Sequence, residues 1–394
     1  MKNSHLISEP AAYAALASFA NGCESGRGSS AWIAWSLEDR ALREGWPEGR
    51  FFGVESELIA HFGTSRETLR EAISMLEAHG SMRMRRGRHG GLQLVSPAME
   101  QAASTLATYL RAVGCTNDEL IETAQVAEPL LNELHDDEPC ALLFKTTLAF
   151  LLSDREKNSC DNNYRDNKSQ RHIRAPGIAF DIVRSALPIP AIGVALGSEA
   201  ELCIKFNSCR SILRQALRIL DDLEMLQVRY GRGGGYMLKP PSPVGMIRHL
   251  FALFASRRQV LPDTNRAISM LNLISLRLAM RRLEKFDGDM KMQCCDSLSA
   301  HLAHAAEPRR WGELQRALST IADSKIVNTL QYAMVAYQVR LARPQAKSKQ
   351  LDNELKIIEQ DLVTSLRRGQ YDKAERLQRI AQARLSEMLE NIAR

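Results

Sequence analysis

Apolar residues recur every three or four positions between residues 66 and 79, and so line one face of a predicted helix. A shorter helix is predicted for residues 55–62, and Gly63 supplies the turn between the two helices. Thr64 and Glu67 have the spacing of a capping box, which predicts that Thr64 caps the second helix. The segment therefore predicts two helices joined by a tight turn.

Apolar and polar residues alternate in residues 82–85 and 92–94, which is typical of half-buried strands. The loop between these strands is rich in arginine and glycine and has the sequence Arg86-Gly87-Arg88-His89-Gly90-Gly91. Two helices followed by a two-stranded hairpin predict a winged helix-turn-helix.

An internal repeat contains this pattern twice. Residues 55–91 align without gaps on residues 199–235 at a constant offset of 144, and 14 of the 37 paired positions are identical. In the second copy Asn207 stands at the turn, where asparagine tolerates a left-handed backbone. The second hairpin loop is Arg229-Tyr230-Gly231-Arg232-Gly233-Gly234-Gly235. The chain is therefore predicted to contain two winged modules.

The rest of the chain is predicted to be helical. A first helix precedes each copy, at about residues 30–44 and 178–187, and residues 98–152 also have helical character. Helices without any strand are predicted from Pro243 to Arg394. Large apolar side chains are almost absent from residues 153–172, which predicts a solvated linker.

These elements predict a mainly α fold with two winged helix-turn-helix domains, whose wings are small β-hairpins, and a C-terminal all-α helical bundle. The expected domains are the winged domains 30–97 and 173–241, a short helical region 98–152, the polar linker 153–172, and a helical effector-binding and dimerisation domain 242–394.

Composition and charge narrow the class of protein only slightly. The chain has 394 residues, a net charge of +6 and a pI of about 8.9, with 45% hydrophobic residues, as in an ordinary globular protein of several domains. Its eight cysteines are scattered, which favours reduced thiols. With no secretory h-region and no apolar run of membrane-spanning length, we expect a cytoplasmic protein.

Arginine placement suggests double-stranded DNA as the partner. Arg66 and Arg70 stand four residues apart and so share a helix face beside the apolar stripe, as do Arg210, Arg214 and Arg218. A helix fits the major groove, where arginine pairs with guanine or clamps a phosphate. The wing arginines and glycines suit contact with the sugar-phosphate backbone. A single helix with exposed arginines is common in proteins. Here the helix pair, the arginine spacing and the arginine-containing hairpin occur in the same order twice, which favours DNA binding.

Both copies resemble the DNA-binding domain of the GntR family of bacterial regulators. The resemblance rests on ESELIAHFGTSRETLREAISMLEAHG and RRGRHGG in the first copy, and on SEAELCIKFNSCRSILRQALRILDDLEML and RYGRGGG in the second. It implies recognition arginines at Arg66, Arg70, Arg210 and Arg214, and wing-tip contacts near Gly87 and Gly231. Where some members carry a further DNA-contacting arginine, this chain has Ser56 and Ala200. The expected DNA-binding residues are Ser65, Arg66, Thr68, Arg70, Arg86, Gly87, Arg88, Arg210, Ser211, Arg214, Tyr230, Gly231 and Arg232.

The C-terminal region resembles the effector-binding helical domain of the FadR subgroup, through ELQRALSTIADSKIVNTLQ and IIEQDLVTSLRRGQYDKAE. This resemblance implies a small-molecule effector and a homodimer, although two modules in one chain could let a monomer act as a pseudo-dimer. The subgroup's metal ligands would fall on Trp311, Gln315, Glu359 and Ala381, so we expect no metal site and no cofactor. Residues 116–152 resemble only the beginning of such a domain, which suggests that a first effector domain was shortened.

The remaining constellations weigh against other functions. Cys294, Cys295, His301 and His304 lack the spacing of a structural zinc site, so packing on a helix explains them better. No nucleophile elbow, P-loop, HExxH or dinucleotide fingerprint occurs, and we expect a non-enzyme. The chain is therefore predicted to be a sequence-specific transcriptional regulator, with repression the expected sign. The alternatives are a non-specific architectural DNA-binding protein and a winged-helix scaffold for protein interactions.

Overall fold

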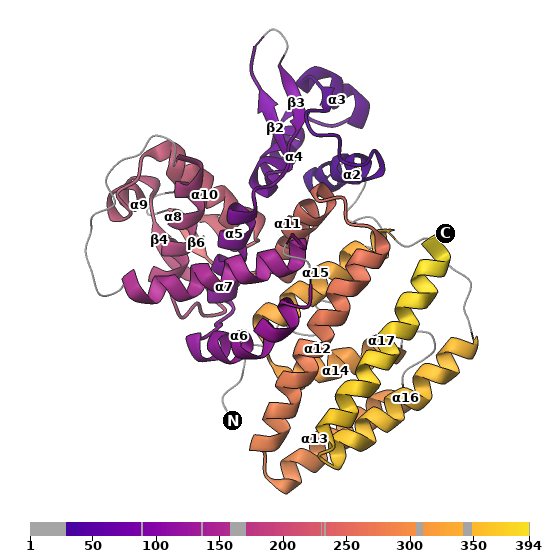
Figure 1. Ribbon diagram of the computed structural model, residues 1–394. Helices are drawn as coiled ribbons and strands as arrows, with labels where there is room; N and C mark the ends of the chain where they lie inside the picture. The colour runs from indigo at the N-terminus through magenta and orange to yellow at the C-terminus, as the bar shows by residue number, and fades with distance from the viewer. Residues whose placement is uncertain are drawn as a thin grey trace. The chain divides into compact units, whose positions relative to one another are not determined.

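The chain forms two compact units in a computed structural model (Figure 1). The structure describes residues 29–87, 90–134, 137–157, 171–229, 231, 234–304, 310–341 and 349–393. Unit 1 comprises residues up to Asn117 together with Leu142–Arg258, and unit 2 comprises Asp118–Ala141 together with Gln259–Arg394. The fold is mainly α-helical with small antiparallel sheets, as predicted.

The first half of unit 1 has helices, a strand, a helix pair and a hairpin in the predicted order. Its elements are α2 (Ser30–Arg43), β1 (Phe51–Gly53), α3 (Glu55–Phe62), α4 (Arg66–His79), β2 (Met82–Arg85), β3 (Gly91–Leu94) and α5 (Met99–Ala112). The three strands form an antiparallel sheet in the order β1-β3-β2. We call α2 to α5 the first repeat.

The same order of elements recurs in the second half of unit 1. The elements are α8 (Arg171–Ser185), β4 (Val194–Gly197), α9 (Glu199–Lys205), α10 (Arg210–Asp222), β5 (Leu226–Arg229), β6 (Gly235–Leu238) and α11 (Pro243–Ser256). The sheet again has its last strand in the middle, in the order β4-β6-β5. Strands β5 and β6 and helix α11 each begin and end 144 residues after their counterparts β2, β3 and α5. We call α8 to α11 the second repeat.

The turns of both helix pairs have the left-handed backbone predicted for them. Gly63 has φ +60° and Asn207 has φ +43°. The predicted cap of α4 is wrong by one residue: Ser65, not Thr64, has the extended N-cap backbone, and its hydroxyl accepts a hydrogen bond from the Thr68 N–H at 3.1 Å. The hydroxyl must face the first turn from the residue that directly precedes the helix, which spacing alone does not identify.

The two repeats pack reciprocally within unit 1. Helix α5 of the first repeat packs on α8 of the second, while α11 of the second packs on α2 and α4 of the first. Helices α5 and α11 also contact one another, as do α4 and α10. Each repeat therefore completes its core with a helix that belongs to the other, and unit 1 is held together as one body.

A buried ionic cluster joins the repeats where α4 and α10 end. His79 is 1% exposed, and its ring nitrogens lie 2.8 Å from Glu38 Oε1 on α2 and 3.1 Å from Asp222 Oδ1 on α10. The hydroxyl of Ser81 also donates to Glu38, at 2.6 Å. His249 on α11 meets the His79 ring edge to face, with ring centroids 6.0 Å apart.

The ionic cluster holds one histidine charged and the other neutral. Burial alone lowers the pKa of His79, but the Asp222 and Glu38 carboxylates outweigh it and raise that pKa to about 10. Burial and the neighbouring His79 charge lower the pKa of His249 to about 4. Burial raises the pKa of Asp222, but the His79 charge and hydrogen bond bring it below its usual value. A histidinium between two carboxylates therefore links the repeats.

Unit 2 is built from helices alone in its described residues. They are α6 (Asn117–Leu131), which starts one residue inside unit 1, and α12 (Leu261–Lys285), α13 (Gly288–His304), α14 (Arg310–Ala322), α15 (Lys325–Leu341), α16 (Lys349–Arg367) and α17 (Tyr371–Ala393). Helix α12 packs against α14, α15 and α17. The described part of the chain after residue 243 contains no strand, as predicted.

Helix α6 reaches unit 2 from the middle of the sequence. The Glu119 carboxylate accepts hydrogen bonds from the backbone N–H and the Nζ of Lys325, at 2.6 and 2.8 Å. The hydroxyls of Thr123 and Ser324 lie 3.0 Å apart. Unit 2 thus includes residues 118–141 as well as the C-terminal segment.

The predicted linker at 153–172 is shorter than expected at both ends. Helix α7 (Pro139–Lys157) continues into it and α8 begins at Arg171, so residues 158–170 of the predicted linker lie outside the described residues. Among the described helices, none is both long enough and apolar enough to span a membrane.

Candidate nucleic-acid interface

An acidic residue on α3 holds the two arginines at the exposed start of α4. The Nε atoms of Arg66 and Arg70 donate to the same Glu55 Oε1, at 3.0 and 2.9 Å. The arginine side chains remain 65% and 62% exposed. The hydrogen bond from Arg70 is the largest influence on the pKa of the Glu55 carboxyl and lowers it; burial opposes this, and the hydrogen bond from Arg66 lowers the pKa further. The pair is thus oriented by a neighbouring helix while it stays open to a ligand.

The second repeat has the same arrangement. Arg214 Nε donates to Glu199 Oε2 at 3.0 Å, and Arg210 Nε lies 3.9 Å from Glu199 Oε1. These arginines are 61% and 75% exposed. Glu199 occupies the position of Glu55, 144 residues later, at the first residue of α9. The carboxylate and the two arginines therefore have equivalent places in both repeats.

The two hairpin loops turn in the same way. Gly87 and Gly231 have φ +114° and +105°, and their carbonyls accept hydrogen bonds from the N–H groups of Gly90 and Gly234 at 2.8 and 2.9 Å. A Cβ atom at Gly90 would overlap the Arg85 carbonyl oxygen. Glycine at these positions lets each hairpin close tightly and keeps its backbone accessible.

The wing residues that follow the first glycine are only partly described. Arg86 and Gly87 are exposed beside the end of β2, as expected for a surface that contacts another molecule. Gly231 lies at the equivalent bend of the second wing. Three residues of the predicted site, Arg88, Tyr230 and Arg232, lie outside the described residues.

The polar residues predicted as DNA contacts lie at the start of α4 and α10, beside the arginines. Ser65 is exposed and Thr68 is half-buried, and their hydroxyls lie 3.0 Å apart. In the second repeat Cys209 replaces Ser65, and its Sγ lies 3.2 Å from the hydroxyl of Ser211. That hydroxyl, followed by the Ile212 N–H, lowers the pKa of the exposed Cys209 thiol.

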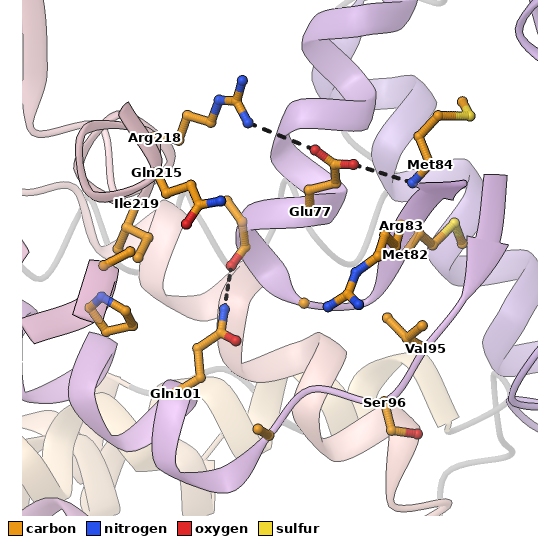
Figure 2. Close-up of a pocket in the computed structure, with 15 residues that line it drawn as sticks. Glu77, Met82, Arg83, Met84, Val95, Ser96, Gln101, Gln215, Arg218 and Ile219 are labelled. Carbon is orange, nitrogen blue, oxygen red and sulfur yellow. Dashed lines mark hydrogen bonds and ion pairs between the residues drawn. The ribbon is translucent and has the colours of Figure 1, made fainter. Parts of the chain in front are cut away.

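Arg218 of the second repeat reaches a groove of the first. This groove, of about 750 Å³, is lined by Arg70 on α4, by the first wing at Arg85, Arg86 and Gly87, and by Arg218. Arg218 Nη1 lies 3.8 Å from Glu77 Oε2 on α4, and the other oxygen of Glu77 accepts a hydrogen bond from the Met84 N–H at 3.2 Å (Figure 2). Residues from both repeats therefore meet beside α4.

Sequence reasoning missed Glu55 and Glu199 as parts of the site. Each lies 11 and 15 residues before the arginines that it binds, so the contact depends on how the two helices cross. The available signal was that both positions hold glutamate in the repeat alignment. It is a weak signal, because acidic residues are also favoured in the first turn of any helix.

The positions aligned with the subgroup's metal ligands hold packing and hydrogen-bonding groups. Gln315 and Gln378 are buried and their amides pair reciprocally, at 2.8 and 3.2 Å. Ala381 and Glu359 are also fully buried. No group of three histidine, cysteine or acidic residues with metal-binding geometry occurs within the described residues. The side chains of Trp311, His301 and His304 lie outside them.

Among solved structures, the chain has a distant likeness to a GntR protein. The solved structure of Streptococcus agalactiae GntR matches with a TM-score of 0.38 and 15% sequence identity, over 54% of this chain and 99% of that chain. No family model and no curated protein matches the chain. At this TM-score the likeness does not assign a family, and the resemblance to GntR regulators stays a prediction.

Proposed function

We propose that the chain is a sequence-specific DNA-binding transcriptional regulator, with winged helix-turn-helix modules at residues 30–97 and 173–241. One observation carries the proposal. Two helices at equivalent positions each present an exposed arginine pair, oriented by a glutamate of the preceding helix and placed beside a glycine-rich hairpin. A helix with an exposed arginine pair can enter the major groove, and the hairpin can contact the adjacent phosphates.

The chemistry of binding follows from the ion pairs. Guanidinium groups that are held by a carboxylate keep a defined direction, so little side-chain freedom is lost when they meet DNA. Guanine O6 and N7 or a phosphate then offer acceptors to the remaining N–H donors. In the free protein Glu55 and Glu199 screen the positive charge, which disfavours binding to duplexes that lack the correct base contacts.

The proposal extends to regulation by an effector. We assign effector binding and homodimer formation to the helical domain expected at residues 242–394, and repression as the consequence of occupying an operator. Within unit 2, a depression of about 370 Å³ between α13 and α16 is lined by Lys356, Glu359 and Arg367 among others. Mixed charge of this kind suits a small polar effector, whose binding would shift the equilibrium between DNA-bound and free states.

Selection of bound sequences from a random duplex pool tests the proposal. The intact protein should enrich a defined sequence, and Arg66→Ala or Arg210→Ala should each weaken binding to it by about 1–3 kcal/mol, or roughly fivefold to 150-fold. Arg43→Ala is the matched control, because Arg43 is an equally exposed arginine on α2 whose partner is Asp39. The control should bind like the parent protein.

The outcomes separate the three classes of protein. A pool without enrichment, bound with steep salt dependence, would identify an architectural DNA-binding protein. A protein that binds no duplex would be a scaffold for protein interactions. An enriched sequence that both arginine variants still bind normally would disprove the assignment of α4 and α10 as recognition helices.

A further inference from the structure

The two recognition helices share their arginines but differ beside them. In the first turn, Ser65, Glu67 and Thr68 of the first repeat correspond to Cys209, Ser211 and Ile212 of the second. All six side chains are exposed or half-buried at the N-terminal end of α4 or α10. The N-terminal residues of a recognition helix are those that contact base edges, so the differences fall where base preference is decided.

The chemistry of these pairs points to different bases. Glu67 offers only acceptors and suits the amino group of cytosine, whereas Ser211 can donate or accept. Thr68 carries a hydroxyl, whereas Ile212 is wholly apolar and suits the methyl group of thymine. The arginines common to both helices suit guanine in both half-sites.

The two repeats cannot move independently of one another, because they are joined at α4 and α10. His79 and Asp222 meet at the C-terminal ends of these helices, and α5 and α11 each pack on the other repeat. Each recognition helix is about 20 Å long at a rise of about 1.5 Å per residue. Their N-termini can therefore lie up to about 40 Å apart, a range that includes the helical repeat of about 34 Å between successive major grooves on one face of B-DNA.

Arg218 adds a second asymmetry. It lines the groove of the first repeat together with Arg70 and Arg86, whereas the equivalent residue of the first repeat is Ser74, which is uncharged. A duplex in the first groove thus meets a cation from the second repeat, whereas Ser74 has no charge to offer at the equivalent position. The half-site bound by the first repeat should therefore gain a phosphate contact from Arg218 of the second repeat.

On the basis of the proposed function, we infer that one chain recognises a single, non-palindromic duplex with two unlike half-sites. Both half-sites contain a guanine contacted by the arginine pair. The base beside it is cytosine where Glu67 faces it and thymine where Ile212 faces it. Symmetric sites follow from identical recognition helices related by a two-fold axis, and these two helices are not identical.

Exchange of the first-turn residues tests the inference. One variant carries Ser65→Cys, Glu67→Ser and Thr68→Ile, so that α4 has the first turn of α10. The converse variant carries Cys209→Ser, Ser211→Glu and Ile212→Thr. Sequences bound by the parent and by both variants are selected from the same random pool, and circular dichroism checks that each variant is folded. The two variants act on different helices, so a folding defect in one leaves the other informative.

The parent should select two unlike halves, and each variant should select a site whose two halves prefer the same bases. Two identical half-sites for the two repeats of one parent chain, or the same asymmetric site for parent and variants, would overturn the inference while leaving the proposed function intact. A pool without any enriched sequence would instead contradict the proposed function.

Discussion

The charge on His79 makes the joint between the repeats sensitive to alkaline pH. The folded-state pKa of His79 is about 10, above its ordinary value of 6.5. Between those values the folded chain binds one more proton than the unfolded chain, so this stabilisation is complete below about pH 6.5 and is lost as pH rises toward 10. His249 acts in the opposite direction, because its pKa of about 4 makes the chain lose stability as pH falls from 6.5.

We therefore expect the free energy of unfolding to decline from about pH 6.5 to pH 10. A His79→Leu variant should not show this decline. The variant should also be less stable by about 3–5 kcal/mol near neutral pH, because Glu38 and Asp222 would stay buried without a cation. Urea denaturation at a series of pH values measures both effects. His61→Gln, at an exposed histidine of α3, is the control. An unchanged pH dependence in the His79 variant would show that this histidine is not the titrating group.

Cys209 provides a chemical reporter of the surface that we propose to face DNA. Its thiol is exposed, and the Ser211 hydroxyl lowers its pKa, whereas burial raises the pKa of Cys294 in unit 2. Iodoacetamide should alkylate Cys209 faster than Cys294 at neutral pH. Duplex at ten times its Kd should slow the reaction at Cys209 about tenfold and leave Cys294 unaffected.

Peptide mass spectrometry measures the alkylation at each cysteine. Cys209→Ser, which copies the serine of the first repeat, should still bind DNA and so shows whether the thiol itself is needed. Equal protection of both cysteines, or of neither, would place the bound duplex elsewhere.

Single residues of the site differ in how far sequence could predict them. Arg66 and Arg70 were predictable because a spacing of four puts two side chains on one helix face. The cluster of Glu38, His79 and Asp222 was not, because its members are 41 and 143 residues apart and meet only through tertiary packing. Histidine at a helix end looks the same in a sequence whether it is solvated or buried.

At the scale of elements, the crossing of α3 and α4 brings Glu55 to both arginines, and its charge should influence DNA selectivity. Glu55→Gln keeps the side-chain size and removes the charge. We expect affinity for a scrambled duplex to rise about twofold to fivefold, as for one exposed ion pair. The ratio of cognate to scrambled affinity should fall, because the arginines lose their orientation.

Fluorescence anisotropy with labelled duplexes measures both affinities. Glu48→Gln makes the same change in net charge at an exposed residue whose partner is Ser96. If the two variants behave alike, Glu55 acts only through net charge and does not orient the arginines.

The helices and strands themselves were largely predictable. Periods of three to four and of two located α3, α4, β2 and β3 closely, because these elements have one buried face. The cap of α4 was misplaced, because adjacent Thr64 and Ser65 have similar side chains and only the backbone angles decide between them. The alignment of 55–91 with 199–235 also underestimated the repeat, which extends to α5 and α11, where few identities remain.

At the scale of the whole molecule, unit 2 depends on a segment that lies between the two repeats. Leu120 and Leu130 of α6 are buried within it, and Glu119 binds Lys325. A fragment of residues 259–394 should therefore unfold at lower temperature than the same fragment mixed with a peptide of residues 118–141. A peptide with Glu119→Ala and Thr123→Ala should stabilise it less.

Thermal unfolding followed by circular dichroism measures the difference between these mixtures. If the peptide leaves the melting temperature unchanged, α6 does not belong to the core of the bundle. The sequence could not predict this association, because the amphipathic pattern of α6 shows that one face is buried but not which helices cover it.

The constant offset between the repeats also has a genetic consequence. In a homodimer of single-module chains, one mutation alters both halves of the DNA-binding surface together. Here a mutation in the codon for Glu67 leaves Ser211 unchanged. Under the proposed function, each repeat could therefore change its base preference while the other repeat preserves binding. Duplication followed by fusion would thus allow a regulator to acquire new target sites by single substitutions, while the unchanged repeat still binds its own half-site.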